Sequence, residues 1–287
     1  MTASPLPRPT LSRRTFIVDL GRGAFALALV SLAGCAGAVG SLAPSGSNPP
    51  GGSSSASPAA TSGGSSPPAS ASAPQGSAPF GGGKTYGKAD GDLAWKRADM
   101  GFVSAYLLVR AGEATLVDTG VSGRADDIEA VVKAAGLTWG NVAHVILTHS
   151  HNDHVGSAAE VLKRASNATG YAGAADIRDI SGMPRPLVAV GEGDRVMGLR
   201  VVTAPGHTPG QVVVHDPIAR LLVAGDSMGT SAGKPILPSA PFTPDMAEAK
   251  RSIAKLGALG FETLLVGHGE PITSGAAALV AELGRAG

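Results

Sequence analysis

Residues 148–154, Thr-His-Ser-His-Asn-Asp-His, follow directly on a short apolar run at 142–147. The run is rich in β-branched residues and bounded by polar ones, which predicts a buried strand. His149 and His151 are two residues apart, so in an extended chain their side chains point the same way. Asp153 and His154 come where the chain turns toward a predicted helix, so they can serve a neighbouring ion.

Three further apolar runs each deliver an imidazole or a carboxylate just past their ends. Residues 199–203 lead to His207, residues 220–223 to Asp226 and residues 263–266 to His268. Further strands are predicted at 103–109, 114–117 and 211–214, and helices at 124–135, 157–165 and 244–259. Gly136 is expected to follow the first helix as its C-cap and Thr243 to cap the last. Strands interleaved with helices predict an α/β layered domain with ligands at the carboxyl edge of its strands.

These residues suit two adjacent divalent metal ions. Imidazole nitrogen and carboxylate oxygen are the ligands of catalytic zinc. His149, His151 and His207 are predicted to form one ligand group, and the other is expected from Asp153, His154 and His268. Asp226 would bridge the two ions through its two oxygens. We expect zinc, with iron and manganese as the alternatives.

The same motifs resemble those of the metallo-β-lactamase superfamily. Its pattern matches His149-x-His151-x-Asp153-His154, then His207 within Gly-His-Thr-Pro-Gly, then Gly225-Asp226 and finally Gly267-His268-Gly269. The resemblance covers most of residues 85–275 and implies a four-layer αββα sandwich. Residues 115–120, Thr-Leu-Val-Asp-Thr-Gly, resemble the early strand and turn of the family. There Asp118 would orient metal ligands from behind, although it could instead simply cap its turn.

The resemblance implies a metal-dependent hydrolase that uses a bridging hydroxide, with Asp153 as a catalytic residue and a small molecule as substrate. A bridging aspartate such as Asp226 is similar to that of glyoxalase II and lactonases, which favours an ester, lactone or thioester over a β-lactam. Glyoxalase II carries a further helical region, whereas this chain ends soon after His268, so a glutathione thioester is not expected. Two alternatives stay open. One is a mononuclear iron persulfide dioxygenase that uses His149, His207 and Asp226, and the other is a non-catalytic, surface-tethered binding protein.

The first 34 residues have the pattern of an export signal. Arg13 and Arg14 precede an apolar stretch that is too short to span a bilayer, as in a twin-arginine signal peptide. It ends in Leu-Ala-Gly-Cys35, which resembles the lipobox of bacterial lipoproteins. Residues 35–84, mostly Gly, Ser, Ala and Pro, predict a disordered linker behind the lipidated Cys35. We therefore expect a bacterial membrane lipoprotein whose catalytic domain, residues 85–287, is exported.

Composition excludes two other classes. The net charge is +1 and the predicted domain has no Lys- or Arg-rich run, so nucleic-acid binding is not expected. A single cysteine leaves no internal disulfide framework.

Two histidines, His144 and His215, lie within or at the edge of predicted strands rather than beyond them. We expect both to be structural.

Overall fold

The computed structural model describes residues 83–87 and 90–286, so the predicted signal, Cys35 and nearly all of the predicted linker lie outside the described residues. Two six-stranded sheets form the described part. The first has the order β2-β3-β4-β5-β6-β7, with bounds Leu93–Asp99, Ser104–Arg110, Glu113–Val117, Val142–Leu147, Thr169–Gly173 and Val188–Val190. Its β4, β5, β6 and β7 run parallel, while β2 and β3 are antiparallel to their neighbours.

The second sheet has the order β1-β8-β9-β10-β11-β14, with bounds Thr85–Tyr86, Arg195–Val196, Leu199–Thr203, Val212–Asp216, Leu221–Val223 and Thr263–Leu265. Since β10 is antiparallel to both β9 and β11, and β14 is parallel to β11, the strands β9, β11 and β14 point the same way. A separate hairpin joins β12 (Gly229–Ser231) to β13 (Lys234–Ile236). The strands that lead to His207, Asp226 and His268 therefore end at one edge of one sheet.

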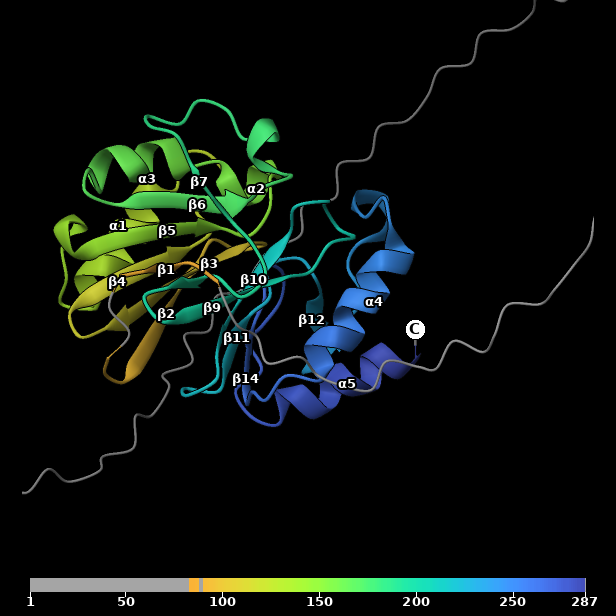
Figure 1. Cartoon of the computed structure of the whole chain (residues 1–287). Coiled ribbons are helices and arrows are strands. Elements are labelled where there is room, and N and C mark those ends of the chain that lie inside the picture. Colours follow the sequence, from red (N-terminus) through yellow and green to blue (C-terminus); the bar gives the residue numbers. More distant parts are fainter. Residues whose placement is uncertain (1–82, 88–89, 287) are drawn as a thin grey trace, which may run out of the picture. The chain divides into compact units, whose positions relative to one another are not determined.

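Helices cover the outer face of each sheet (Figure 1). The helices α1 (Ala125–Ala134), α2 (Asn152–Val155) and α3 (Ala158–Arg164) lie with the first sheet, and α4 (Met246–Gly257) and α5 (Ala276–Ala286) lie with the second. Short 3-10 turns occupy Trp139–Asn141, Ile177–Asp179 and Ala240–Phe242. No helix among the described residues is long and apolar enough to cross a membrane.

Side chains that alternate along the strands divide the core into three apolar layers. On β3, Leu107 packs with α1 and α3, while Tyr106 and Leu108 pack between the two sheets. On β10, Val214 lies in that central layer and Val213 packs against α4 and α5. Successive strand residues point to opposite faces, so a strand buried on both faces must be apolar throughout. The order is helix, sheet, sheet, helix, which confirms the predicted αββα sandwich.

One capping prediction is wrong. The helix α4 begins after Asp245, whose side chain accepts a hydrogen bond from the backbone N–H of Glu248. The predicted cap, Thr243, instead donates its hydroxyl to the carbonyl of Ser239 and contacts His207. Pro244 lacks an N–H and disfavours helical backbone in the residue before it, so the helix starts after the proline. The predicted C-cap of the first helix, Gly136, directly follows the observed C-cap, Ala135, so that prediction differs by one residue.

Candidate metal centre

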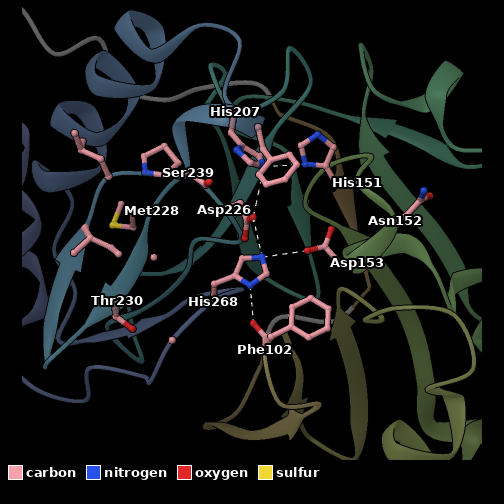
Figure 2. Close-up of a pocket in the computed structure, with 16 residues that line it drawn as sticks. Phe102, His151, Asn152, Asp153, His207, Asp226, Met228, Thr230, Ser239 and His268 are labelled. Atoms are coloured by element: carbon pink, nitrogen blue, oxygen red, sulfur yellow. Dashed lines mark hydrogen bonds and ion pairs between the residues drawn. The ribbon is translucent and has the colours of Figure 1, made fainter. Parts of the chain in front are cut away.

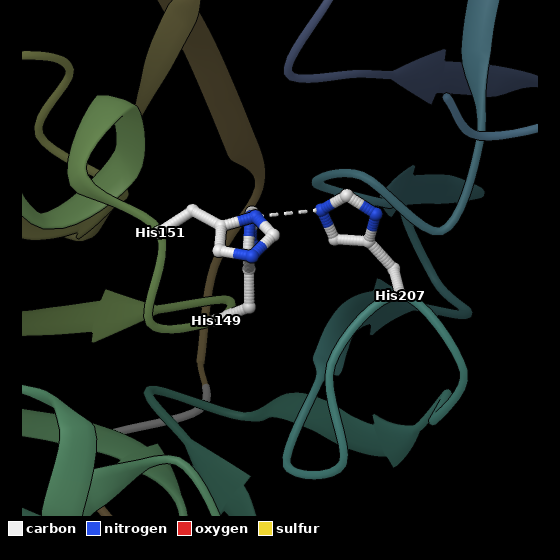
Figure 3. Close-up of side chains that lie close together, drawn as sticks. All are labelled: His149, His151 and His207. Atoms are coloured by element: carbon white, nitrogen blue, oxygen red, sulfur yellow. Dashed lines mark hydrogen bonds between the residues drawn. The ribbon is translucent and has the colours of Figure 1, made fainter. Parts of the chain in front are cut away.

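The seven predicted ligands meet at one end of the two sheets. Three groups have ligand atoms within 4.8 Å of one another: His149, His151 and His207; His149, His154 and Asp226; and Asp153, His154 and His268. His149 and His151 come from the end of β5 in the first sheet, and His207 approaches from the loop after β9 in the second (Figure 3). The backbone N–H of Val212 also donates to the carbonyl of Thr148, 2.9 Å away. The centre therefore lies where the two sheets are joined.

Two histidines of the first sheet are held by a hydrogen bond at Nδ1. The Thr148 hydroxyl donates to Asp118 (2.8 Å), so it accepts from Nδ1 of His149 (3.0 Å). His154 donates its Nδ1–H to the Asp118 carboxylate, 2.9 Å away. In the neutral form of each ring, Nε2 is therefore the atom that can donate a lone pair to a metal. Fixing one ring nitrogen in this way orients the other and is typical of metal-ligating histidines.

The second sheet repeats this arrangement. Thr243 donates its hydroxyl to the Ser239 carbonyl (2.8 Å), so it accepts from Nδ1 of His207 (3.0 Å). His268 donates its Nδ1–H to the carbonyl of Phe102, 2.6 Å away. Its ring also stacks against the Phe102 ring, with centroids 6.1 Å apart. Four imidazoles are thus oriented with Nε2 toward the centre of the cluster.

Several atoms at the centre lack the partners that buried polar groups normally have. Within the described residues, Nε2 of His149, Nε2 of His154 and Oδ1 of Asp226 are buried and make no hydrogen bond, although the last two lie 3.2 Å apart as a potential ion pair. A buried polar atom without a partner costs free energy. All three are ligand atoms for divalent ions, and they face the same small space. The donor set therefore fits metal ions.

Asp226 lies between the ligand groups. Its Oδ2 is 3.1 Å from Nε2 of His268 and 3.5 Å from Nε2 of His207 (Figure 2). Its Oδ1 is 3.2 Å from Nε2 of His154. The backbone comes close because of a glycine: a Cβ on Gly267 would lie 2.3 Å from Oδ1 of Asp226. A larger residue there would push the carboxylate out of place. One carboxylate thus reaches both predicted sites.

Electrostatics favour cations at this centre. Burial lowers the pKa of His149 well below its ordinary value and that of His207 to about 4, so both rings are neutral and ready to bind metal. Burial also lowers the pKa of His154, but Asp118 and Asp226 outweigh this and raise it well above normal. Hydrogen bonds to Asp153 and Asp226 raise the pKa of His268 to about 10. The carboxylates therefore attract positive charge into the cluster.

Of the two roles that the sequence left open, the hydrogen bonds of the Asp118 carboxylate favour support of the ligands, because they go to Thr148 and His154 and not to its own turn. Asp118 adopts a left-handed φ of 62°, a strained conformation that Asp tolerates better than most residues. Its Oδ1 accepts from the backbone N–H of Thr148 at 2.7 Å, while its Oδ2 accepts from the Thr148 hydroxyl and from His154. The turn therefore directs a carboxylate behind two ligand histidines.

Asp176 is a site residue that the sequence reasoning missed. It is fully buried, and its carboxylate accepts from the backbone N–H of Ser150 (3.0 Å), the hydroxyl of Thr208 (2.6 Å) and the backbone N–H of Gly210 (2.6 Å). It therefore ties the loop that carries His151 to the loop that carries His207. A signal was present, because Asp176 follows closely on β6, just as the ligands follow their strands.

The two other histidines lie away from the cluster, as expected. His144 lies on β5 with its ring between the Tyr171 hydroxyl (3.1 Å) and the Glu113 carboxylate (3.2 Å). His215 lies on β10 with Nε2 3.2 Å from the carbonyl of Gly260. Neither belongs to a group of potential metal ligands among the described residues.

A pocket of about 870 Å³ opens over the ligands (Figure 2). Five of the seven candidate ligands line it: His151, Asp153, His207, Asp226 and His268. Its volume lies within the range of small-molecule sites. Of the two carboxylates that line the pocket, Asp153 is the more exposed, with 29% of its side chain accessible against 12% for Asp226. A small substrate in the pocket would therefore reach the ligands and Asp153 directly.

Comparison with known proteins identifies the family. The model of the "Metallo-beta-lactamase superfamily" matches residues 98–268, which include all seven candidate ligands. The chain belongs to this superfamily. Its own cluster of histidines and aspartates lies at the edge where β5, β9, β11 and β14 end.

Relatives within the superfamily include two hydrolases. Hydroxyacylglutathione hydrolase from Fuscovulum blasticum is 32% identical over 171 residues, covering 57% of this chain and 61% of that protein. The enzyme of the same name from Cereibacter sphaeroides is 34% identical over 164 residues, covering 55% and 58%. The matched region thus spans about three fifths of each relative.

Solved structures agree with the fold. The protein TTHA1623 in a di-iron-bound form has a TM-score of 0.51 and 27% identity, covering 63% of this chain and 94% of that one. A metallo-beta-lactamase family protein from Thermus thermophilus has a TM-score of 0.55 and 21% identity, covering 68% and 77%. Because the second structure is only 21% identical, its similarity supports the αββα fold and nothing further.

Proposed function

We propose that this protein is a metal-dependent hydrolase with a two-metal centre that cleaves an ester, lactone or thioester. The position of Asp226 carries the proposal, because its carboxylate is within 3.5 Å of histidines from both ligand groups. Bound metal ions would supply an activated water and polarise a carbonyl oxygen. The relatives named as hydrolases support the same class of reaction.

The residues of the chain have distinct roles in this proposal. One ion would be held by His149, His151 and His207, and the other by Asp153, His154 and His268. Asp226 would contribute to both sites. Asp153 lies 3.2 Å from Nε2 of His268 and lines the pocket, so it would orient the attacking water and receive its proton. Zinc suits the nitrogen and oxygen ligands, and the di-iron form of TTHA1623 makes iron the alternative.

A substrate screen tests the class of reaction. The metal-loaded protein would be assayed against lactones, thioesters, phosphodiesters and β-lactams, with its metal content measured by elemental analysis. We expect hydrolysis of carbonyl esters, lactones or thioesters and two metal ions per chain. One iron per chain, with oxygen consumption on a persulfide, would assign the protein to the dioxygenase class instead. No turnover of any substrate would favour a binding protein.

We also propose that the catalytic domain is exported and tethered to a bacterial membrane. The motifs at Arg13, Arg14 and Cys35 support this, followed by the Gly-, Ser- and Pro-rich segment. Replacing Cys35→Ser should release the protein from the membrane fraction, because the acylated sulfur would be lost. Replacing both arginines by lysine should block export. Unchanged fractionation of the Cys35 variant would end the lipoprotein proposal, and normal export of the lysine variant would indicate a different translocation route.

A further inference from the structure

The pocket has two unlike sides. On the side of the β12–β13 hairpin most of the lining side chains are apolar, with Thr230 and Ser239 among them. We call the apolar ones the apolar wall: Met228, Ile236, Leu237, Pro238 and Phe242. Figure 2 shows Met228 on one side of Asp226 and His268, with Asp153 and Asn152 on the other. A substrate that bridges the pocket would thus meet a polar surface at one end and an apolar one at the other.

Exposed apolar side chains gather at this pocket. The large hydrophobic residues exposed in the described structure are Phe102, Ile236, Phe242 and Ile218. The first three line the pocket, with exposures of 61%, 45% and 64%, whereas Ile218 lies outside it. A single exposed apolar residue is ordinary, but several around one cavity indicate a binding surface.

Apart from its candidate ligand histidines, the described lining has no positively charged side chain. Among the described residues that line the pocket, none is lysine or arginine. Arg97 donates to the carbonyl of Gly269, which is a lining residue, but its guanidinium lies 2.7 Å from the Glu270 carboxylate. Lys234 begins β13 and does not line the pocket. An anionic group placed against the apolar wall would lose water and gain no lysine or arginine partner.

The orientation of the substrate in the pocket follows from the place where its leaving group takes up a proton. In hydrolysis the bond between the carbonyl carbon and the leaving oxygen or sulfur breaks, a bond to the oxygen of water forms, and the leaving group departs with a proton of that water. Asp153, which would carry this proton, lies on the polar side with Asn152. The leaving group therefore faces that side, and the acyl chain faces the apolar wall.

We propose that the substrate is an ester, lactone or thioester with an uncharged, apolar acyl chain that lies along the apolar wall, and an uncharged leaving group. This inference rests on the proposed function and specifies its substrate class. It sets the chain apart from its relatives named hydroxyacylglutathione hydrolase, because glutathione carries two carboxylates. Those carboxylates would meet no lysine or arginine among the described lining residues.

Two thioesters that share one acyl group test the charge requirement. The metal-loaded full chain would be assayed with hexanoyl-N-acetylcysteamine, which is neutral, and with hexanoyl-glutathione. The same bond is broken in both, so kcat/KM should favour the neutral compound by about tenfold or more, the ratio that corresponds to about 1.4 kcal/mol. Equal rates or a preference for the glutathione thioester would overturn the inference and leave the proposed function standing. No hydrolysis of either thioester, or of a neutral ester or lactone, would overturn both.

Variants of the wall test the place of the acyl chain. Lengthening the acyl group from butanoyl to hexanoyl should raise kcat/KM about tenfold in the parent, since each buried methylene contributes about threefold to fourfold. Ile236→Ser and Phe242→Ser should remove most of this gain, so that the hexanoyl and butanoyl thioesters are hydrolysed with similar kcat/KM. Ile218→Ser makes the same replacement at an exposed residue outside the pocket, so this variant should keep the gain. If all three variants keep the parent's chain-length dependence, the acyl chain does not lie on the wall.

Discussion

The ligand cluster and the apolar wall lie in one pocket but are built in different ways. In the cluster, His149 and His207 are buried, and each gives its second ring nitrogen to a threonine hydroxyl. On the wall, Ile236 and Phe242 are exposed and carry no polar group. Changing a cluster residue therefore disturbs a network of interdependent groups, whereas changing a wall residue removes contact area only.

In the proposed function, chemistry and specificity reside in different parts of the chain. Residues of the cluster follow the ends of strands that the whole sandwich holds in place. The wall comes from a two-stranded hairpin and the residues on either side of it, outside the two main sheets. Substitutions there can alter the substrate without moving a ligand, which is the usual relation between a rigid scaffold and its loops.

Among residues that support the ligands without binding metal themselves, Asp118 should show the largest loss of activity or metal affinity, in the variant Asp118→Asn. An amide has one acceptor oxygen, so either the Thr148 N–H or the pair formed by the Thr148 hydroxyl and His154 would face an NH2 group. We expect hydrolysis or metal affinity to fall by about 10-fold to 100-fold, the usual cost of losing such a partner. Steady-state kinetics and a chelator competition would measure this.

The matched control for Asp118 is Asp126→Asn. It makes the same chemical change at an exposed carboxylate that pairs with Arg164 on the surface. It should leave activity and metal affinity within about twofold of the parent, because exposed ion pairs contribute little. If Asp118→Asn behaves like this control, Asp118 does not support the ligands.

A smaller and more local effect is expected from Asp176→Asn. The variant would leave at least one of three donors, from Ser150, Thr208 and Gly210, facing an NH2 group in a buried place. We expect a stability loss of about 1–3 kcal/mol. The ion held by His149, His151 and His207 should also weaken by about tenfold, on the scale of other supporting partners. Thermal unfolding and a metal titration would record the two effects separately.

Asp179→Asn, at an exposed carboxylate three residues further on, is the control for Asp176. It should change neither the unfolding temperature nor the metal titration. Equal weakening of both metal sites in Asp176→Asn would show that Asp176 acts on overall stability and does not position the His151 and His207 loops.

The smallest effect is expected on the wall. Phe242→Ala removes a ring that is 64% exposed, so the free energy of unfolding should change by no more than about 0.5 kcal/mol. Metal content should stay at the parent value. Elemental analysis and chemical denaturation would check both. Loss of metal in this variant would mean that the wall and the cluster are not independent.

Much of the centre could be predicted from the sequence because each ligand follows a short apolar run. Buried strands must be apolar on both faces, so polar residues at their ends stand out, as His149 and His268 do. The strand at Val142–Leu147 was predicted at its observed bounds. Others shifted by one or two residues, as at Val212–Asp216, where His215 and Asp216 interrupt the apolar pattern although both are buried.

The roles of other residues depend on contacts that the local sequence does not show. Ile236 and Phe242 form the wall only because the hairpin and the segment after it come beside Asp226, and neither residue belongs to a motif. Asp176 acts through partners 26 and 34 residues away in the chain. Thr243 was predicted as a helix cap because threonine commonly caps helices, yet its hydroxyl accepts from His207. Contacts between distant segments decide these roles.

The count of metal ions in Asp226→Ala, beside the parent and His144→Ala, tests the two-metal centre most directly. Elemental analysis would give metal per chain, and the same samples would be assayed for hydrolysis. Removing the carboxylate leaves two cations facing each other with less negative charge between them, so at least one should be lost together with most activity. His144 contacts Tyr171 and Glu113 rather than the cluster, so its variant should keep both ions and the activity. Two tightly held ions and full activity in Asp226→Ala would contradict the account.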